Sequence, residues 1–169
     1  MIDNRKIEKE PIEGILNNII GTANVSIQCT KFNSRMVYIS TDYVYKGSKG
    51  NYSEENEVLP FNMYAWTKLG GECSVKCVPN HLIIRTSFGS DKFPYDIAFE
   101  NQYTSKDYVS VIAPMIYKAA TSDMTGILNI GTQRKSMYEY AIQKNPNITK
   151  IETEYQDHSL NTFRFHEIE

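Results

Sequence analysis

A tyrosine and a lysine stand four residues apart in the segment Tyr64-Ala-Trp-Thr-Lys68. On a helix, residues i and i+4 share a face, so the phenol and the ammonium can point into one cleft. A free tyrosine, with a pKa of about 10, is a poor acid–base group at neutral pH, and a neighbouring ammonium lowers that pKa. The spacing therefore predicts proton transfer, although it also suits a solvated pair on a helix surface.

Two hydroxyl residues, Ser40 and Thr41, directly follow the apolar run Met36-Val-Tyr-Ile39. A short, continuously apolar run is typical of a strand covered on both faces, as in a parallel sheet. In an open parallel sheet, ligands bind outside the carboxyl ends of the strands. A hydroxyl there can hydrogen-bond a substrate carbonyl or alcohol while the tyrosine transfers the proton. Taken alone, the pair also fits an ordinary strand-end turn.

The elements that would position these groups alternate between helix and strand. Apolar residues at helical spacing indicate helices, and short apolar runs indicate buried strands. This alternation predicts an α/β fold with three parallel strands side by side. The predicted helices span 11–31, 62–78, 105–120 and 136–143, and the predicted strands lie near 36–40, 82–86 and 127–130.

Two of the predicted helices carry more detailed expectations. The first should bury one apolar stripe, and the third should begin at Ser105 as its cap. The stripe consists of Ile12, Ile15, Leu16, Ile19, Ile20, Ala23 and Ile27. These elements divide the chain into a Rossmann-like α/β region over residues 1–145 and a polar tail over 146–169 that the pattern does not place.

Composition excludes several classes of protein. A chain of 169 residues that is 41% hydrophobic and 22% charged fits one globular domain. Its net charge of −2 argues against nucleic-acid or anionic-membrane partners, and the charged start MIDNRKIEKE has no apolar signal segment. No apolar run reaches the ~18 residues of a membrane span. Three cysteines without a C-x-x-C pair predict neither a disulfide framework nor a zinc site, so no metal and a cytoplasmic location are expected.

The separate motifs join into a longer pattern along the chain. The strand-end segment Ile39-Ser-Thr-Asp-Tyr-Val-Tyr45 is followed by a polar loop, and then by Pro60-Phe-Asn-Met-Tyr64 and Lys68-Leu-Gly-Gly-Glu72. Together these segments resemble the extended short-chain dehydrogenases/reductases, and within them the dTDP-4-dehydrorhamnose reductase family. Further matching segments are Asn18–Thr22, Leu82–Ser87, Gln102–Val109 and Gly126–Gly131.

The resemblance implies a reaction and a set of residue roles. The reaction is hydride transfer from NAD(P)H to the C4 ketone of a nucleotide-linked 4-keto-6-deoxy sugar, with protonation by Tyr64. Asn18 would support Lys68 through a water, and Arg85 would either face the substrate or be structural. The implied catalytic residues are Thr41, Tyr64, Lys68 and Asn18; the cofactor residues are Tyr64, Lys68, Ser40 and Thr86; the substrate residues are Thr41, Asp42, Arg85 and Ser87.

The sequence also departs from that family. Its whole members begin with a strand, a glycine-rich turn and a helix that holds the pyrophosphate. The chain has no G-x-G-x-x-G, so we expect a partial doubly wound sheet that lacks the first βαβαβ half through N-terminal truncation. Such a chain should bind NAD(P)H weakly or not at all alone. Its exposed sheet edge favours a homodimer or association with a separately encoded N-terminal half.

A second departure separates related activities. Sugar-nucleotide dehydratases carry Thr-Asp-Glu where this chain has Thr41-Asp42-Tyr43, and tyrosine cannot replace that glutamate as a base at neutral pH without a large pKa shift. A reductase is therefore favoured over a dehydratase. Two alternatives stay open: a non-catalytic regulatory module like the methionine adenosyltransferase beta subunit, which has a similar STDYV-type segment, and a fragment of a sugar-nucleotide epimerase or dehydratase.

Overall fold

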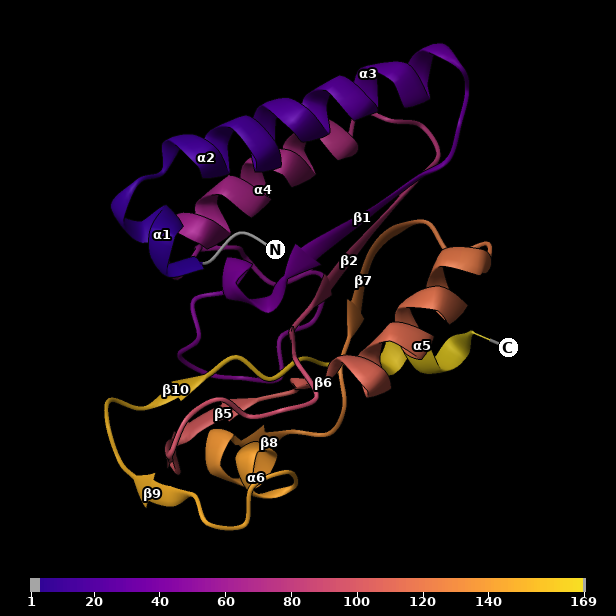
Figure 1. Ribbon diagram of the computed structural model, residues 1–169. Helices are drawn as coiled ribbons and strands as arrows, with labels where there is room; N and C mark the ends of the chain where they lie inside the picture. The colour runs from indigo at the N-terminus through magenta and orange to yellow at the C-terminus, as the bar shows by residue number, and fades with distance from the viewer. Residues whose placement is uncertain (1–3, 169) are drawn as a thin grey trace.

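The centre of the molecule is a three-stranded parallel sheet. The computed structural model describes residues 4–168, and the sheet consists of β1 (Met36–Thr41), β2 (His81–Thr86) and β7 (Gly126–Ile130) in the order β1-β2-β7. Figure 1 shows the three strands running side by side. The predicted α/β class and the three adjacent parallel strands are therefore confirmed. Within the described residues, β1 pairs with a strand on one edge alone.

The sheet separates two apolar cores because successive strand residues point to opposite faces. On one face, Tyr38 and Ile83 pack with Val75 of α4 (Met63–Val75). On the other, Leu82, Ile84, Leu128 and Ile130 pack with α5 (Val109–Thr121) and with Phe165 and Ile168 near the C-terminus. Figure 1 shows α4 and α5 on opposite sides of the strands. The crossing helices thus bury both faces, as the continuous apolar strands require.

The N-terminal helical region runs through α1 (Asn4–Lys9), α2 (Ile12–Gly14), the π-helix η1 (Ile15–Gly21) and α3 (Thr22–Lys31). It packs on α4 through small residues. A β-carbon added at Gly71 of α4 would lie 2.5 Å from the Asn18 carbonyl oxygen, which no real side chain tolerates. Glycine at this position therefore lets the π-helix approach the helix that carries Tyr64 and Lys68.

The predicted buried stripe on the first helix is wrong. Ile12 is 68% exposed, Leu16 52% and Ile27 49%. Buried positions fall instead on small residues, Gly14, Thr22 and Ser26, which face α4 or β1. The helices approach closely through these small groups, so the long aliphatic side chains are left outside the contact.

A second lobe lies beyond the carboxyl ends of the sheet strands. Its core consists of Phe93, Ala98, Tyr108, Tyr140, Ala141 and Ile148. The short strands pair as β3–β6, β4–β9 and β10–β5–β8. Figure 1 shows β5, β8, β9 and β10 in the lower part of the molecule. Their bounds are β3 (Phe88–Gly89), β4 (Ile97–Phe99), β5 (Gln102–Thr104), β6 (Asp107–Tyr108), β8 (Lys135–Ser136), β9 (Thr149–Ile151) and β10 (Gln156–Asp157).

The structure changes the start of one predicted helix in this region and confirms another. The helix expected over 105–120 begins at Val109, because β5 and β6 occupy the preceding residues. Ser105 is not its cap; the Ser105 hydroxyl accepts a hydrogen bond from the Leu160 N–H at 3.0 Å. The short helix expected over 136–143 is α6 (Met137–Ile142), and Ser136 caps it reciprocally with Glu139.

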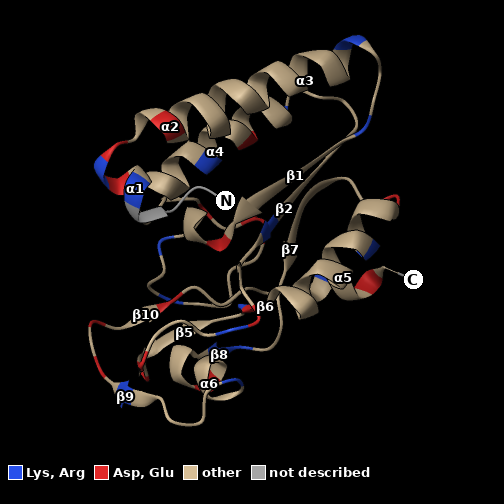
Figure 2. Cartoon of the chain, viewed as in Figure 1, with Lys and Arg blue, Asp and Glu red and all other residues tan. Residues whose placement is uncertain are grey.

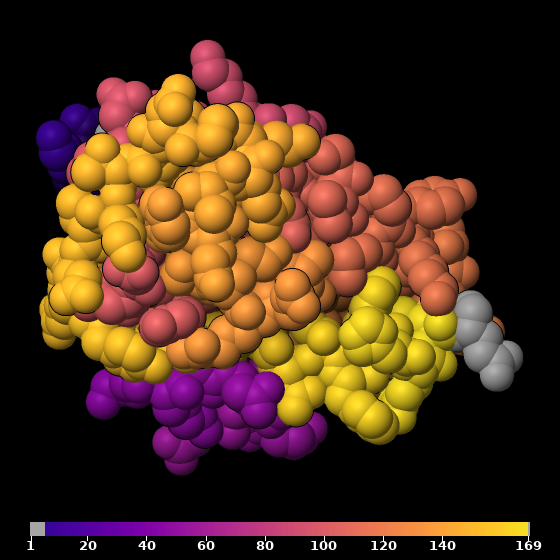
Figure 3. Space-filling view, turned by 90° about the horizontal axis from the view of Figure 1, so that it is seen from below, coloured from indigo at the N-terminus to yellow at the C-terminus, as the bar shows by residue number. Residues whose placement is uncertain are grey.

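The residues after 145, which the sequence pattern did not place, are packed parts of the fold. β9 pairs with β4, β10 pairs with β5, and the 3₁₀-helix η3 (Phe163–Glu167) packs on β7. Tyr52 N–H donates to Ser159 O at 2.9 Å, which ties this segment to the loop after β1. Figure 3, a view from below, shows the gold and yellow C-terminal segment beside the purple residues of this loop.

Charges and cysteines give no sign of a specialised surface or metal site. Figure 2 shows basic and acidic residues interspersed over the helices and loops. From residue 4 to residue 168, no helix is long and apolar enough to cross the bilayer. Over the same residues, no group of His, Cys, Asp and Glu is arranged to hold a metal ion, and Cys29, Cys73 and Cys77 are free.

Candidate active site

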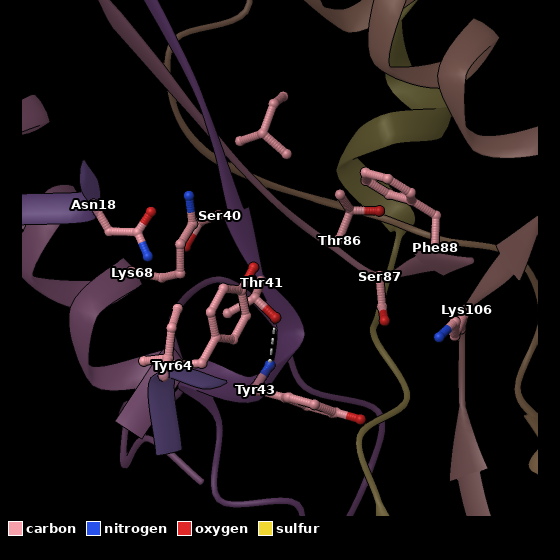
Figure 4. Close-up of a pocket in the computed structure, with 12 residues that line it drawn as sticks. Asn18, Ser40, Thr41, Tyr43, Tyr64, Lys68, Thr86, Ser87, Phe88 and Lys106 are labelled. Atoms are coloured by element: carbon pink, nitrogen blue, oxygen red, sulfur yellow. Dashed lines mark hydrogen bonds between the residues drawn. The ribbon is translucent and has the colours of Figure 1, made fainter. Parts of the chain in front are cut away.

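A cleft of about 340 Å³ lies at the carboxyl ends of β1 and β2, between the sheet and the second lobe. Figure 4 shows polar side chains entering it from both sides. The structure brings together seven of the predicted site residues here: Asn18, Ser40, Thr41, Tyr64, Lys68, Thr86 and Ser87. The cleft is also lined by Ile7, Ile39, Tyr43, Phe88 and Lys106, which were not predicted as site residues.

Thr41 occupies the last position of β1, where the chain turns into the 3₁₀-helix η2 (Asp42–Val44). Its hydroxyl oxygen accepts from the Tyr43 N–H at 3.3 Å and its hydroxyl donates to Asp42 Oδ1 at 3.2 Å. Thr41 is buried, yet it lines the cleft. The turn therefore fixes the hydroxyl at the cleft wall.

Tyr64 sits in the first turn of α4, and two acceptors hold that turn. Asn62 caps the helix by accepting from the Ala65 N–H at 2.8 Å, and the Glu8 carboxylate accepts from the N–H of Met63 and of Tyr64. Burial, followed by the charge of Asp42, raises the pKa of Tyr64 to about 12. The phenol is therefore protonated at neutral pH, which is the form that donates a proton.

Lys68 lies one turn further along α4 and lines the same cleft. Its ammonium sits over the Tyr38 ring, 4.2 Å from the centroid. Burial lowers the pKa of Lys68 to about 8, against the opposing charge of Glu72. The structure does not show the predicted lowering of the Tyr64 pKa, because burial of the phenol outweighs other influences and Lys68 is not among them.

Asn18 approaches α4 from the π-helix. Its Nδ2 donates to Thr67 Oγ1 at 2.9 Å, and the Thr67 hydroxyl donates to the Tyr64 carbonyl at 2.8 Å. The side chain thus connects η1 to the turn of α4 that carries Tyr64 and Lys68. Single-turn π-helices often mark functional sites, and here the irregular turn is what brings Asn18 to the cleft.

Two predicted substrate residues lie outside the cleft lining. Arg85 is 2% exposed, and its guanidinium donates to both oxygens of Glu72, at 3.1 and 2.7 Å. Asp42 is 1% exposed, and burial raises its pKa to about 7. Of the two roles open for Arg85, the structure therefore supports the structural one.

Ser40 belongs to the same buried network, although it lines the cleft. Its hydroxyl donates to Glu72 Oε1 at 2.5 Å, and Arg85 reaches on to the Tyr45 hydroxyl at 3.0 Å. Tyr45 in turn donates to Asn129 Oδ1 of β7 at 3.1 Å. The network joins α4 to all three strands of the sheet, and it leaves the Ser40 hydroxyl committed inside the protein rather than to a cofactor.

The opposite wall of the cleft carries a hydroxyl without an internal partner. Thr86 Oγ1 is buried and has no hydrogen-bond partner within the described part of the chain. Ser87 and Lys106 line the cleft beside it, and Figure 4 shows them on the side away from Lys68. Sequence reasoning missed Lys106 because β6, only two residues long, has no readable periodicity. Tyr43 was detectable, since it lies two residues after Thr41 at a strand end.

Comparisons with known proteins identify relatives of part of this chain. A dTDP-4-dehydrorhamnose reductase from Mycolicibacterium smegmatis is 28% identical over 130 residues, which are 73% of this chain and 40% of that protein. The methionine adenosyltransferase 2 subunit beta of Xenopus tropicalis is 32% identical over 69 residues, 41% of this chain and 21% of that protein. The chain thus spans less than half the length of either relative.

Solved structures extend the likeness to the whole fold. A hypothetical dTDP-4-dehydrorhamnose reductase from Sulfolobus tokodaii superimposes with a TM-score of 0.87 at 27% identity, covering 100% of this chain and 71% of that one. The reductase from Bacillus anthracis in complex with NADP has a TM-score of 0.83 at 24% identity and covers 98% and 69%. The RmlD substrate binding domain model matches residues 3–141. Because this match covers most of the chain, the chain belongs to that family of RmlD substrate-binding domains.

Proposed function

We propose that this chain supplies the acid–base and substrate-binding part of an NAD(P)H-dependent reductase acting on a nucleotide-linked 4-keto-6-deoxy sugar. The observation that carries the proposal is that Thr41, Tyr64 and Lys68 line one cleft at the carboxyl end of the sheet. Membership of the RmlD family supports the same reaction class.

Each residue of the cleft would have its own role in the reaction. Thr41 would turn its hydroxyl from Asp42 Oδ1 towards the ketone oxygen and orient it. Tyr64, protonated because its pKa is raised to about 12, gives its proton to that oxygen as negative charge develops. The phenolate left behind lies in a cleft that also contains the Lys68 ammonium, which stabilises it. The raised pKa suits reduction better than the reverse oxidation, which needs the phenolate at the start.

The cleft residues fit the nicotinamide end of the cofactor. Thr86 Oγ1 is a buried hydroxyl that lacks a partner, and Lys68 joins none of the ion pairs within the described residues. Thr86 would hold the nicotinamide side and Lys68 the ribose hydroxyls. When bound, NAD(P)H supplies the hydride that reduces the ketone. The glycine-rich turn that cradles a pyrophosphate is not in this sequence, which supports weak binding by this chain alone.

Consumption of NADPH with a dTDP-4-keto-6-deoxyhexose tests the proposal. The reaction is followed with the chain alone and after mixing with a separately produced nucleotide-binding half of a homologous reductase. Turnover is expected in at least one of the two, and the Tyr64→Phe variant should abolish it. The absence of turnover in both would refute the proposed reaction.

A second function is favoured by the environment of Tyr64. The phenol has a raised pKa, and the Lys68 ammonium lies against Tyr38. A regulatory module that binds a nucleotide ligand without turnover needs no lowered tyrosine pKa, and the likeness to the methionine adenosyltransferase subunit supports it. Copurification with a methionine adenosyltransferase, together with ligand binding that is unchanged in Tyr64→Phe, would favour this alternative. The third alternative is that the chain is a fragment of a sugar-nucleotide epimerase or dehydratase.

The expected partner, a second copy or a separate N-terminal half, is part of the proposal. Support comes from the single-sided pairing of β1 and from an exposed apolar helix surface. That surface consists of Ile12, Leu16, Ile20 and Ile27 of the N-terminal helices and Met63 and Trp66 of α4. Light scattering should give a mass above that of a monomer, and Ile20→Lys should lower it. A cytoplasmic location is also proposed, and the three free cysteines support it.

A further inference from the structure

Lys106 is a cation in the cleft for which the proposed reaction has no use. It lies between β5 and β6 and lines the cleft with Ser87 and Tyr43. Figure 4 shows its side chain across the cleft from Tyr64 and Lys68. Proton transfer and cofactor binding are assigned to other residues, so Lys106 needs an explanation of its own.

The structure holds this side chain in place. The Lys106 N–H donates to Thr104 Oγ1 at 2.9 Å, which fixes the turn between the two strands. Its ammonium lies 5.6 Å from the centroid of the Tyr140 ring, and Tyr140 is buried in the core of the second lobe. A β-carbon at Gly89 would lie 3.4 Å from Lys106 Cε, so the stem runs beside that glycine. Lys106 is therefore a supported part of the cleft wall rather than a free surface chain.

No carboxylate neutralises the Lys106 ammonium. The five ion pairs formed within 4.0 Å among the described residues do not include it. Burial lowers the pKa of Lys106, and Asp42 supplies the one charge that opposes the shift. The Asp42 carboxyl has a pKa raised to about 7, so its own charge is partly lost at neutral pH. A desolvated cation without a close partner is costly, and a bound anion would offset that cost.

The groups beside Lys106 are also donors. Thr86 Oγ1 is buried without a partner, and Ser87 lines the same wall. A wall made of an ammonium and hydroxyls is complementary to a ligand group rich in acceptor oxygens. The opposite wall, with Tyr64 and Thr41, takes the reacting ketone, so the group that meets Lys106 belongs to another part of the same ligand.

We propose that Lys106 is a specificity-determining residue that pairs with an anionic oxygen of the bound substrate. This inference rests on the proposed function, because it takes the cleft as a sugar-nucleotide site. Sugar nucleotides carry anionic oxygens on the diphosphate and, in the uronic acids, on a carboxylate of the sugar; a 4-keto-6-deoxy sugar nucleotide has those of the diphosphate alone. Both present the same chemistry to the ammonium.

Calorimetric titration with UDP-glucose and UDP-glucuronic acid separates these two sources. Lys106→Met should weaken the binding of UDP-glucuronic acid about tenfold or more, and Lys106→Arg should retain it. An equal loss for UDP-glucose assigns the diphosphate, whereas unchanged binding of UDP-glucose assigns the sugar carboxylate. Lys31→Met, an exposed lysine at the end of α3, is the matched control and should leave both affinities unchanged.

Equal affinities of the wild-type chain and Lys106→Met for both probes would overturn the inference, as would a wild-type chain that binds neither. Thermal unfolding of Lys106→Met shows whether the variant is folded, and Lys106→Gln is the replacement if it is not. The outcome is distinguishable from failure of the proposed reaction. Binding that depends on Lys106, without any turnover of a ketosugar, would refute the reductase and leave this inference standing.

Discussion

The two walls of the cleft are built from different kinds of structure. Thr41, Tyr64 and Lys68 stand on the six-residue strand β1 of the main sheet and on a thirteen-residue helix that packs against this sheet. Phe88 and Lys106 belong to the second lobe, where β3 and β6 have two residues each. The first wall is fixed by the core of the fold, while the second depends on turns. The proposed reaction chemistry is thus placed on long elements and the proposed ligand recognition on short ones.

This contrast gives different expectations for substitutions. A change on the sheet wall should affect either the chemical step or the stability of the whole domain, because the same elements carry both. A change on the lobe wall should affect affinity for a ligand while stability stays close to that of the wild type. The four predictions below test the contrast.

The largest effect is expected for Tyr64→Phe on the sheet wall. Removing the phenolic proton should lower the rate of ketone reduction by roughly a hundredfold to ten-thousandfold. The melting temperature should change little, since no hydrogen bond donated by the Tyr64 hydroxyl holds the described fold together. Tyr117→Phe, on an exposed position of α5, is the control. A Tyr64→Phe enzyme that keeps the wild-type rate would break the contrast at its strongest point.

A large loss of stability is expected for Glu72→Ala. Glu72 and Arg85 form a buried pair with side-chain exposures of 1% and 3%, and the change leaves the guanidinium without its counter-charge. The free energy of unfolding should fall by about 3–5 kcal/mol in urea titrations. The double variant Glu72→Met with Arg85→Leu removes both charges and should recover most of the loss. If the double variant is as unstable as the single one, the charge argument is incorrect.

The sequence predicted the sheet wall well for a physical reason. Apolar strands and a periodic helix carry their structure in a local pattern, so β1, β2, β7 and α4 were placed close to their observed bounds. The lobe wall gave no such signal, because Lys106 follows a strand of three residues and precedes one of two. Whether a strand-end polar residue enters a cleft or a core depends on distant partners. Arg85 illustrates this, since Glu72 on α4 captures its guanidinium.

A smaller and opposite effect is expected for Asp42→Asn, a buried position directly after Thr41. The folded-state pKa of Asp42, about 7, is above the ordinary value of 3.8, so the folded state binds the proton more tightly. Stability from this group is present below pH 3.8 and is lost as the pH rises through 7.

At pH 8 the free energy of unfolding of the Asp42→Asn variant should therefore exceed that of the wild type by roughly 1–3 kcal/mol. This gain in stability should shrink towards pH 4, because the wild-type carboxyl is then protonated in the folded state. The Asn amide oxygen can still accept the hydrogen bond from the Thr41 hydroxyl. Urea titrations at the two pH values measure the difference. A gain that is the same at both would show that the carboxylate charge is not its cause.

The smallest effect is expected on the outer edge of the second lobe. Lys150 and Glu100 form an ion pair of 2.9 Å between β9 and the end of β4, with side-chain exposures of 56% and 44%. Solvent screens such a pair, so Lys150→Met should leave the free energy of unfolding close to that of the wild type. Denaturant titration at low and high salt checks this. A loss comparable to that of Glu72→Ala would erase the difference between the regions.

The C-terminal segment has a consequence for the order in which the protein can be made. The strands β1, β2 and β7 pair in chain order, so each can join the sheet soon after its synthesis. The loop after β1 depends on the segment from β10 to η3, which is synthesised last. Ser159 of that segment accepts a hydrogen bond from Asn51, 108 residues earlier, and Arg164 donates one to the Ile127 carbonyl. The loop after β1 must therefore wait for nearly all the chain to leave the ribosome. A nascent chain stopped before residue 156 would have a formed sheet, but the loop after β1 would still lack its hydrogen bonds to the C-terminal segment.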